Sequence, residues 1–112
     1  MIEVFLGSGL GGVFRYSLGL ISLKLFNLSW PGTLFVNVIG SVLIVIIFKK
    51  IHQYDQRFIN FFVTGFLGGF TTFSSFSLDI FKSVSDGNYQ MAIMILFLNI
   101  TLGIIMGVII FR

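Results

Sequence analysis

The sequence predicts an all-α membrane protein with four transmembrane helices, the third of which is broken near its middle. Of the 112 residues, 56% are hydrophobic and 10% are charged, so the chain lacks the polar side chains that would cover a soluble domain. The apolar residues form four runs, each close to the roughly 20 residues that span a bilayer as a helix. Glycine and hydroxyl residues interrupt the third run, and at membrane depth they suggest a helix that is broken, closely packed or lining a polar path.

The predicted spans are residues 2–22, 30–48, 58–81 and 91–111. The segments between them are short, so residues 1–112 are predicted to form one four-helix transmembrane domain. Glu3 stands where a signal peptide carries basic residues, and no small-residue cleavage site follows the first span. We therefore expect the first span to be a membrane helix rather than a cleaved signal peptide.

Arg15 is the only cation well inside a predicted span. A charge near the bilayer centre costs at least about 2.5–3.5 kcal/mol, so such residues tend to be functional or paired. Its place toward the far end of the first span allows two interpretations. Either the side chain extends to the membrane interface, or it forms an electropositive vestibule that attracts anions. In the same span Gly7 and Gly11 match a small-residue packing motif.

The second span carries a polar stripe on an otherwise apolar helix. Thr33, Asn37 and Ser41 recur at every fourth residue and so share one helical face. A buried asparagine must satisfy its amide, whose NH2 group can donate to an anion or to a neighbouring helix. Both interpretations of Asn37 stay open on the sequence alone.

The third span contains the most unusual segment, GFLGGFTTFSSFSLD at residues 65–79. Gly68 and Gly69 are followed by two threonines, a combination that favours unwinding of the helix and release of backbone carbonyls. Phenylalanines and serines alternate along this segment: Phe66, Phe70, Phe73 and Phe76, with Ser74, Ser75 and Ser77. The rings either face lipid or core, or line a path on which their edges contact an anion weakly enough to let it pass.

The fourth span has Asn99, Gly103 and Gly107 on one face, which indicates close helix packing. No acidic residue lies at the middle of any span, which disfavours proton-coupled transport. The chain has no cysteine, and no nucleophile–base arrangement, phosphate loop or metal-spaced cluster is present. We therefore expect no enzymatic activity.

The basic residues predict orientation only weakly. Lys49, Lys50, Arg57 and Arg112 fall on one predicted side of the membrane, and Arg15, Lys24 and Lys82 on the other. Four against three is a small positive-inside bias. Such a chain either inserts both ways and pairs antiparallel with its own copies, or takes one orientation set by Lys49 and Lys50. The charges form no extended basic patch, which disfavours nucleic-acid binding.

Three segments together resemble the Fluc (CrcB) family of bacterial fluoride channels: GGVFRYSLG at 11–19, PGTLFVNVIGS at 31–41 and GFLGGFTTFSSFSLD at 65–79. The resemblance covers nearly the whole chain. It implies a dual-topology antiparallel homodimer of four-helix subunits with two fluoride pores, placed in the bacterial inner (plasma) membrane. It also implies a structural sodium ion at the dimer centre.

The same resemblance implies roles for individual residues. The pore rings would be Phe73 and Phe76, the pore amide Asn37, the pore hydroxyls Ser74 and Ser75, and the vestibule cation Arg15; the sodium ion would be held by the backbone carbonyls of Gly68 and Thr71. Two features depart from the family pattern. Asp79 stands where Glu is usual, and Phe97 and Thr101 stand where a Tyr and a Ser are frequent.

The resulting prediction is a passive fluoride-selective channel, through which the membrane potential drives fluoride out of the cytoplasm. Retention of Phe73, Phe76 and Asn37 favours a homodimer over a pair of unequal subunits. The alternatives are a small proton-coupled multidrug exporter of the four-helix dual-topology type and a non-transporting assembly subunit. A missing mid-span carboxylate disfavours the first, and the polar stripes disfavour the second.

Overall fold

The computed structural model describes residues 1–112 and is entirely helical, with no β-strand. Four helices are long and apolar enough to cross a membrane: α1 (Ile2–Phe26), α2 (Trp30–Lys49), a third crossing over Gln56–Ser85, and α6 (Tyr89–Phe111). This confirms the prediction of an all-α protein with four membrane-spanning helices. A short 3-10 helix, η1 (Ile51–Gln53), lies between α2 and the third crossing.

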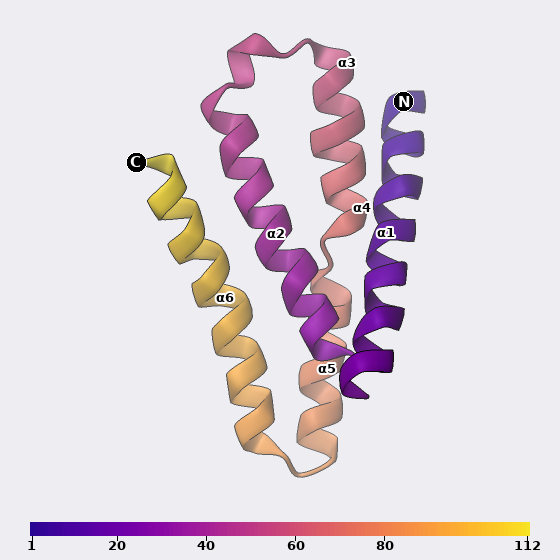
Figure 1. Ribbon diagram of the computed structural model, residues 1–112, viewed down its shortest axis with the longest axis vertical. Helices are drawn as coiled ribbons and strands as arrows, with labels where there is room; N and C mark the ends of the chain where they lie inside the picture. Colours follow the sequence, from indigo (N-terminus) through magenta and orange to yellow (C-terminus); the bar gives the residue numbers. More distant parts are fainter.

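The third crossing consists of several helical segments rather than one. It runs through α3 (Gln56–Phe58), the π-helix η2 (Ile59–Leu67) and α4 (Gly68–Phe70), and continues as α5 (Phe73–Ser85). Thr71 and Thr72 between α4 and α5 have extended backbone angles, with φ/ψ of −83/156° and −151/116°. Figure 1 shows this stretch as a thin trace between two coiled segments.

A local capping interaction explains why a new helix begins at Phe73. The Thr72 side chain accepts a hydrogen bond from the Ser75 N–H at 3.1 Å, which is the usual N-cap arrangement for threonine. The β-branched side chain of Thr72 also fits the extended backbone better than a helical turn.

The helices extend beyond the predicted spans because caps, not the ends of the apolar runs, terminate them. α1 continues past residue 22 to Phe26 and ends at Asn27, whose φ of 55° is a left-handed C-cap. The third crossing begins at Gln56 rather than 58, since the Asp55 side chain accepts from the Phe58 N–H. α6 begins at Tyr89 rather than 91, because the Asn88 side chain accepts from the Met91 N–H.

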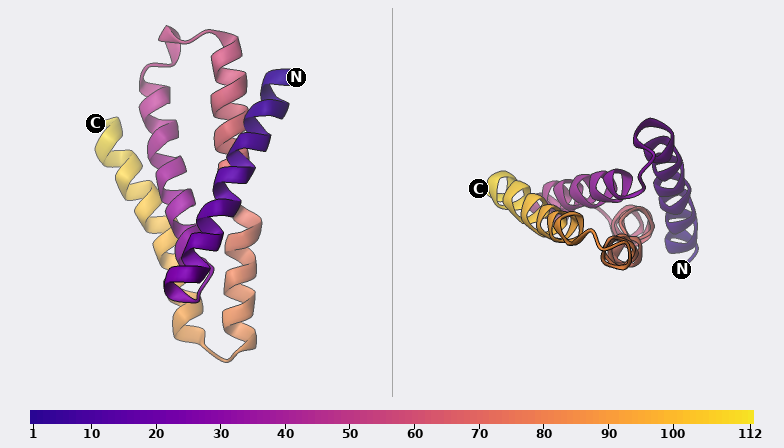
Figure 2. Two further views of the ribbon diagram at one scale, coloured as in Figure 1. Left: turned by 45° about the vertical axis from the view of Figure 1, so that its right-hand side comes forward. Right: turned by 90° about the horizontal axis from the view of Figure 1, so that it is seen from below.

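The helices pack in a defined neighbour order. α1 packs against η2, α4 and α2, whereas α6 packs against α2 and α5. Figure 2 shows α1 and α6 at opposite edges of the arrangement, with α2 and the third crossing between them. α1 and α6 therefore each leave a broad face uncovered within one chain.

Glycines allow the close contact between α1 and the third crossing. A Cβ atom added at Gly7 would collide with the Phe61 carbonyl oxygen, and one at Gly11 with the Phe66 carbonyl oxygen. The small-residue motif in the first span is thus a backbone-to-backbone contact, as such motifs usually are in membranes.

Candidate functional site

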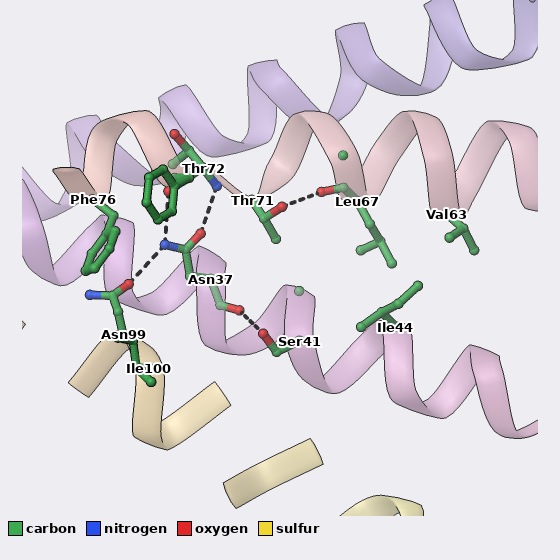
Figure 3. A pocket seen from close by; sticks show the side chains of 13 residues that line it. Asn37, Ser41, Ile44, Val63, Leu67, Thr71, Thr72, Phe76, Asn99 and Ile100 are labelled. Carbon is green, nitrogen blue, oxygen red and sulfur yellow. Dashed lines mark hydrogen bonds between the residues drawn. The ribbon is translucent and has the colours of Figure 1, made fainter. Parts of the chain in front are cut away.

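A groove lined by both polar and apolar residues lies where α2 and α6 face the third crossing, on both sides of its interruption. Its volume is about 480 Å³. Five of the residues predicted for the site line it: Asn37, Gly68, Thr71, Phe73 and Phe76. Asn99, Ser41 and Thr72 add further polar groups (Figure 3).

Asn37 joins the interrupted backbone to α6. Its Oδ1 accepts from the Thr72 N–H at 2.8 Å, and its Nδ2 donates to the Thr72 carbonyl at 3.1 Å. Nδ2 also donates to Oδ1 of Asn99 at 2.9 Å. The amide thus pairs with Thr72 as the backbone of a neighbouring strand would, and it satisfies groups that the interruption would leave unpaired at membrane depth.

Asn99, like Ser41 and Thr72, lines the groove although the sequence analysis did not place it in the site. Its side chain accepts from Asn37 and donates through Nδ2 to the carbonyl of Ile95 at 2.9 Å. The feature of the sequence that could have identified Asn99 as a site residue is its amide side chain, which lies inside an otherwise apolar helix. The sequence analysis assigned that helical face to packing, because two glycines share it.

At the interruption, the Leu67 carbonyl keeps its helical donor and gains a second one, whereas the Gly68 and Gly69 carbonyls do not have their usual helical donors. The Leu67 carbonyl accepts from both the N–H and the hydroxyl of Thr71, at 3.0 and 2.9 Å. The Gly69 carbonyl accepts from Nε of Arg15 at 3.0 Å. The Thr72 N–H, which would bond to the Gly68 carbonyl in a continuous α-helix, bonds to Asn37 instead. The Gly68 carbonyl has therefore lost its usual helical donor.

Arg15 thus lies beside the interrupted helix. Its guanidinium stabilises the C-terminal end of α4, where unpaired carbonyls carry partial negative charge. No group of three or more His, Cys, Asp or Glu side chains could hold a metal ion. A cation at this site would therefore rely on backbone and hydroxyl oxygens.

The two predicted pore rings differ in exposure. Both rings line the groove, but Phe76 is 7% exposed whereas Phe73 is 79% exposed. Their centroids are 5.4 Å apart at an interplanar angle of 60°. Phe66 and Phe70 stack with each other before the interruption. Because Thr71 and Thr72 are extended, the helical repeat does not continue across them. The predicted stripe of four rings is therefore divided into two pairs, Phe66 with Phe70 and Phe73 with Phe76.

A second cavity of about 200 Å³ lies between α1, α2 and α5. Arg15, Ser75, Asp79 and Lys82 line it, and Thr72 lines both this cavity and the groove. Ser74 lies outside both: it is exposed, with its hydroxyl 3.1 Å from that of Thr72. The predicted serine pair is therefore divided between the second cavity and the surface.

Asp79 is buried, with 6% of its surface exposed. Its Oδ1 accepts from the Ser29 hydroxyl at 2.7 Å, and its Oδ2 has no hydrogen-bond partner. This carboxyl group ties α5 to the start of α2 at the end of the second cavity.

A family model described as CrcB-like protein, Camphor Resistance (CrcB), matches residues 2–110. The chain belongs to the CrcB family. The four spans and this membership make the CrcB chain a multi-pass membrane protein.

Relatives of this CrcB chain carry the name "Fluoride-specific ion channel FluC". The protein from Coxiella burnetii is 38% identical over 120 residues, covering 100% of this chain and 97% of its own. The protein from Serratia proteamaculans is 35% identical over 117 residues, covering 99% and 90%. The protein from Cereibacter sphaeroides is 40% identical over 93 residues, covering 82% and 75%.

Proposed function

We propose that this chain is a passive fluoride-selective channel of the bacterial inner membrane, which exports cytoplasmic fluoride. The carrying observation is alignment over its full length with a relative named as a fluoride-specific ion channel. The groove adds physical support, because it combines amide groups, hydroxyl groups and phenylalanine rings at the interruption of a membrane helix.

The groove suits a small, strongly hydrated anion. Fluoride entering it exchanges water for amide and hydroxyl donors and for the positive ring edges of Phe73 and Phe76. Each contact is weaker than a full positive charge, so the ion can leave as readily as it enters. Arg15 and Lys82 at the second cavity supply positive potential that attracts anions toward the Ser75 hydroxyl and Thr72.

The functional unit we propose is an antiparallel homodimer with two pores. A single chain leaves Phe73 largely exposed and its groove open. A second copy would cover both and complete the lining of each pore. The small bias in basic charge is compatible with insertion in both orientations.

The interrupted helix fits a structural sodium ion at the dimer centre. The Gly68 carbonyl has lost its helical donor, and Thr71 lies beside it in the same groove. Carbonyls at the C-terminal end of a half-helix are suited to coordinate a sodium ion in membrane proteins. Two copies would supply Gly68 and Thr71 carbonyls from opposite directions, and the bound cation would stabilise the dimer.

Fluoride efflux from liposomes tests the proposed function. The purified protein is reconstituted with a potassium gradient, and external fluoride is followed with an electrode after valinomycin addition. Rapid valinomycin-dependent fluoride release, without chloride release in a parallel experiment, is the expected result. Vesicles with folded protein that release fluoride no faster than protein-free vesicles would contradict the proposal.

A further inference from the structure

We propose that the end of the molecule formed by the α1–α2 and α5–α6 turns binds one phospholipid with a zwitterionic headgroup, phosphatidylethanolamine. An acyl chain of this lipid lies in an apolar pocket on α2, and the headgroup lies in a polar pocket that adjoins it. Both turns lie toward the lower end of Figure 1. The inference goes beyond fluoride conduction and does not depend on it.

The apolar pocket has a volume of about 530 Å³ and is separate from the groove of the candidate site, with which it shares no lining residue. It is lined by the end of α1, the α1–α2 turn, the first half of α2 and one residue of α6: Phe26, Leu28, Trp30, Pro31, Leu34, Phe35, Val38 and Leu102. These elements belong to membrane-spanning helices. A hydrocarbon chain therefore fills such a pocket more favourably than water does.

The polar pocket has a volume of about 280 Å³ and is continuous with the apolar one, because Leu28 and Trp30 line both. Its polar lining comes from the two turns and the end of α5, and includes Asn27, Lys82, Asp86 and Asn88. Trp30 thus marks the boundary between an apolar and a polar region, the position that tryptophan favours at membrane interfaces. The two pockets together have the polarity pattern of one lipid molecule.

Two opposite charges in the polar pocket have no partner within the chain. Lys82 and Asp86 lie one helical turn apart, yet neither side chain forms an ion pair, since the ion pairs of this chain all involve Glu3. A lysine that precedes an acidic residue by four positions is the less favourable order for pairing along a helix. Both charges are therefore available to a ligand that carries a phosphate and an ammonium group close together.

The position of Asp86 favours a bound cation. Asp86 is the C-cap of α5, where the helix dipole disfavours negative charge and favours positive charge. A primary ammonium has three N–H donors for the carboxylate. The quaternary ammonium of phosphatidylcholine has none, and phosphatidylglycerol carries no positive charge. Asp86 thus favours phosphatidylethanolamine over both.

The phosphate group has several donors in the same pocket. Lys82 supplies an ammonium group, which also reaches the second cavity. The Asn88 side chain uses its oxygen to cap α6, so its NH2 group stays free to donate. Charged and amide donors of this kind form short, strong hydrogen bonds with phosphate oxygens.

Trp30 provides a direct test, because it is the only tryptophan of the chain and lines both pockets. The protein is reconstituted in phosphatidylcholine bilayers that contain equal fractions of phosphatidylethanolamine, phosphatidylglycerol or phosphatidylcholine with brominated acyl chains. Bromine quenches indole fluorescence on contact. We expect phosphatidylethanolamine to quench most, with a relative affinity about two- to fivefold above phosphatidylcholine, the scale of an exposed ion pair.

Equal quenching by the three lipids would overturn the proposal. So would strongest quenching by phosphatidylglycerol, which would indicate a site for anionic lipid at Lys82 alone. The measurement needs no fluoride, so its result is independent of whether the chain conducts.

Two variants test the headgroup contacts. Lys82→Gln and Asp86→Asn each remove one of the two complementary charges, and we expect each to lower the preference for phosphatidylethanolamine to the level of phosphatidylcholine. Lys24→Gln is the matched control, because Lys24 lies in the last turn of α1 but lines neither pocket. Circular dichroism checks that each variant folds. A preference unchanged in both folded variants would contradict the assignment.

Discussion

Single side chains replace the hydrogen bonds that the third crossing gives up at its interruption. Asn37 pairs with both backbone groups of Thr72, and Arg15 satisfies the Gly69 carbonyl. The Thr72 side chain in turn caps α5. A polar group left unpaired in the bilayer core costs several kcal/mol. These three residues therefore make the irregular backbone possible, whatever else they contribute to transport.

Phe76 gives a residue-scale prediction for conduction. Phe76→Ile removes an aromatic edge from the groove but retains an apolar side chain, so we expect it to abolish fluoride efflux while the protein still folds. Phe81→Ile is the matched control, since Phe81 is on the same helix and 67% exposed. Efflux from Phe76→Ile vesicles equal to that of the control would remove Phe76 from the pore.

Ser29 gives a residue-scale prediction for stability. Ser29→Ala would leave both oxygens of the buried Asp79 without a partner, and a lost partner for one buried polar group costs about 1–3 kcal/mol. Denaturation in detergent, followed by circular dichroism, should show this loss. Ser17→Ala is the control, because the exposed Ser17 hydroxyl bonds only to its own helix. Equal stability of the two variants would argue against a role for the Ser29–Asp79 bond.

At the scale of elements, capping side chains decide where helices begin and end. Glycines decide where two helices can approach each other closely. Asp55 and Asn88 each start a helix. Gly7 and Gly11 let α1 touch the backbone of η2, and Gly40 lets α2 approach the methyl group of Thr71. The position of the interruption relative to α1 and α2 thus depends on glycines in both neighbours.

Two glycines of α1 provide a matched test of this packing. In Gly11→Ala the new methyl group meets the Phe66 carbonyl, which cannot move without shifting the helix. We expect a loss of about 1–3 kcal/mol, as for other overpacked sites. In Gly9→Ala nothing lies within 4 Å of the new Cβ, so the better helix propensity of alanine should stabilise by up to about 1 kcal/mol. Denaturation midpoints that do not separate in this order would contradict the close contact.

At the scale of the whole molecule, one chain leaves most of its apolar surface uncovered. Only 16 of 112 residues are buried, and large apolar side chains are exposed on every membrane-spanning helix. Lipid can cover most of this surface, because lipid tails are as apolar as the side chains themselves. Lipid would not satisfy the amide and hydroxyl groups of the groove beside Phe73, which the proposed second copy would cover.

Insertion in both orientations can be tested with single cysteines, because the natural chain has none. His52→Cys and Asp86→Cys place one thiol at each end of the molecule, in η1 and at the α5–α6 turn. For dual topology we expect a membrane-impermeant thiol reagent to label about half of each variant in intact cells. Full labelling of one variant with protection of the other would show a single orientation.

The sequence by itself determined the fold class, the four membrane-spanning helices and the segment that departs from helical geometry. These features follow from local properties: the length of apolar runs, the two glycines before Thr71 and Thr72, and the N-cap of α5. Family membership, too, was recognisable from three motifs. Such signals are readable because each depends on residues close together in the chain.

Only the tertiary structure decided which polar groups remain free. The sequence could not show that Thr72 and Asn99 would occupy the amide of Asn37, or that Arg15 would bond to Gly69. Nor could it show that Phe76 would be buried and Phe73 exposed. Each outcome depends on which atoms of different helices come within hydrogen-bond or packing distance. That is set by how the helices pack against one another, and not by the spacing of residues along any one of them.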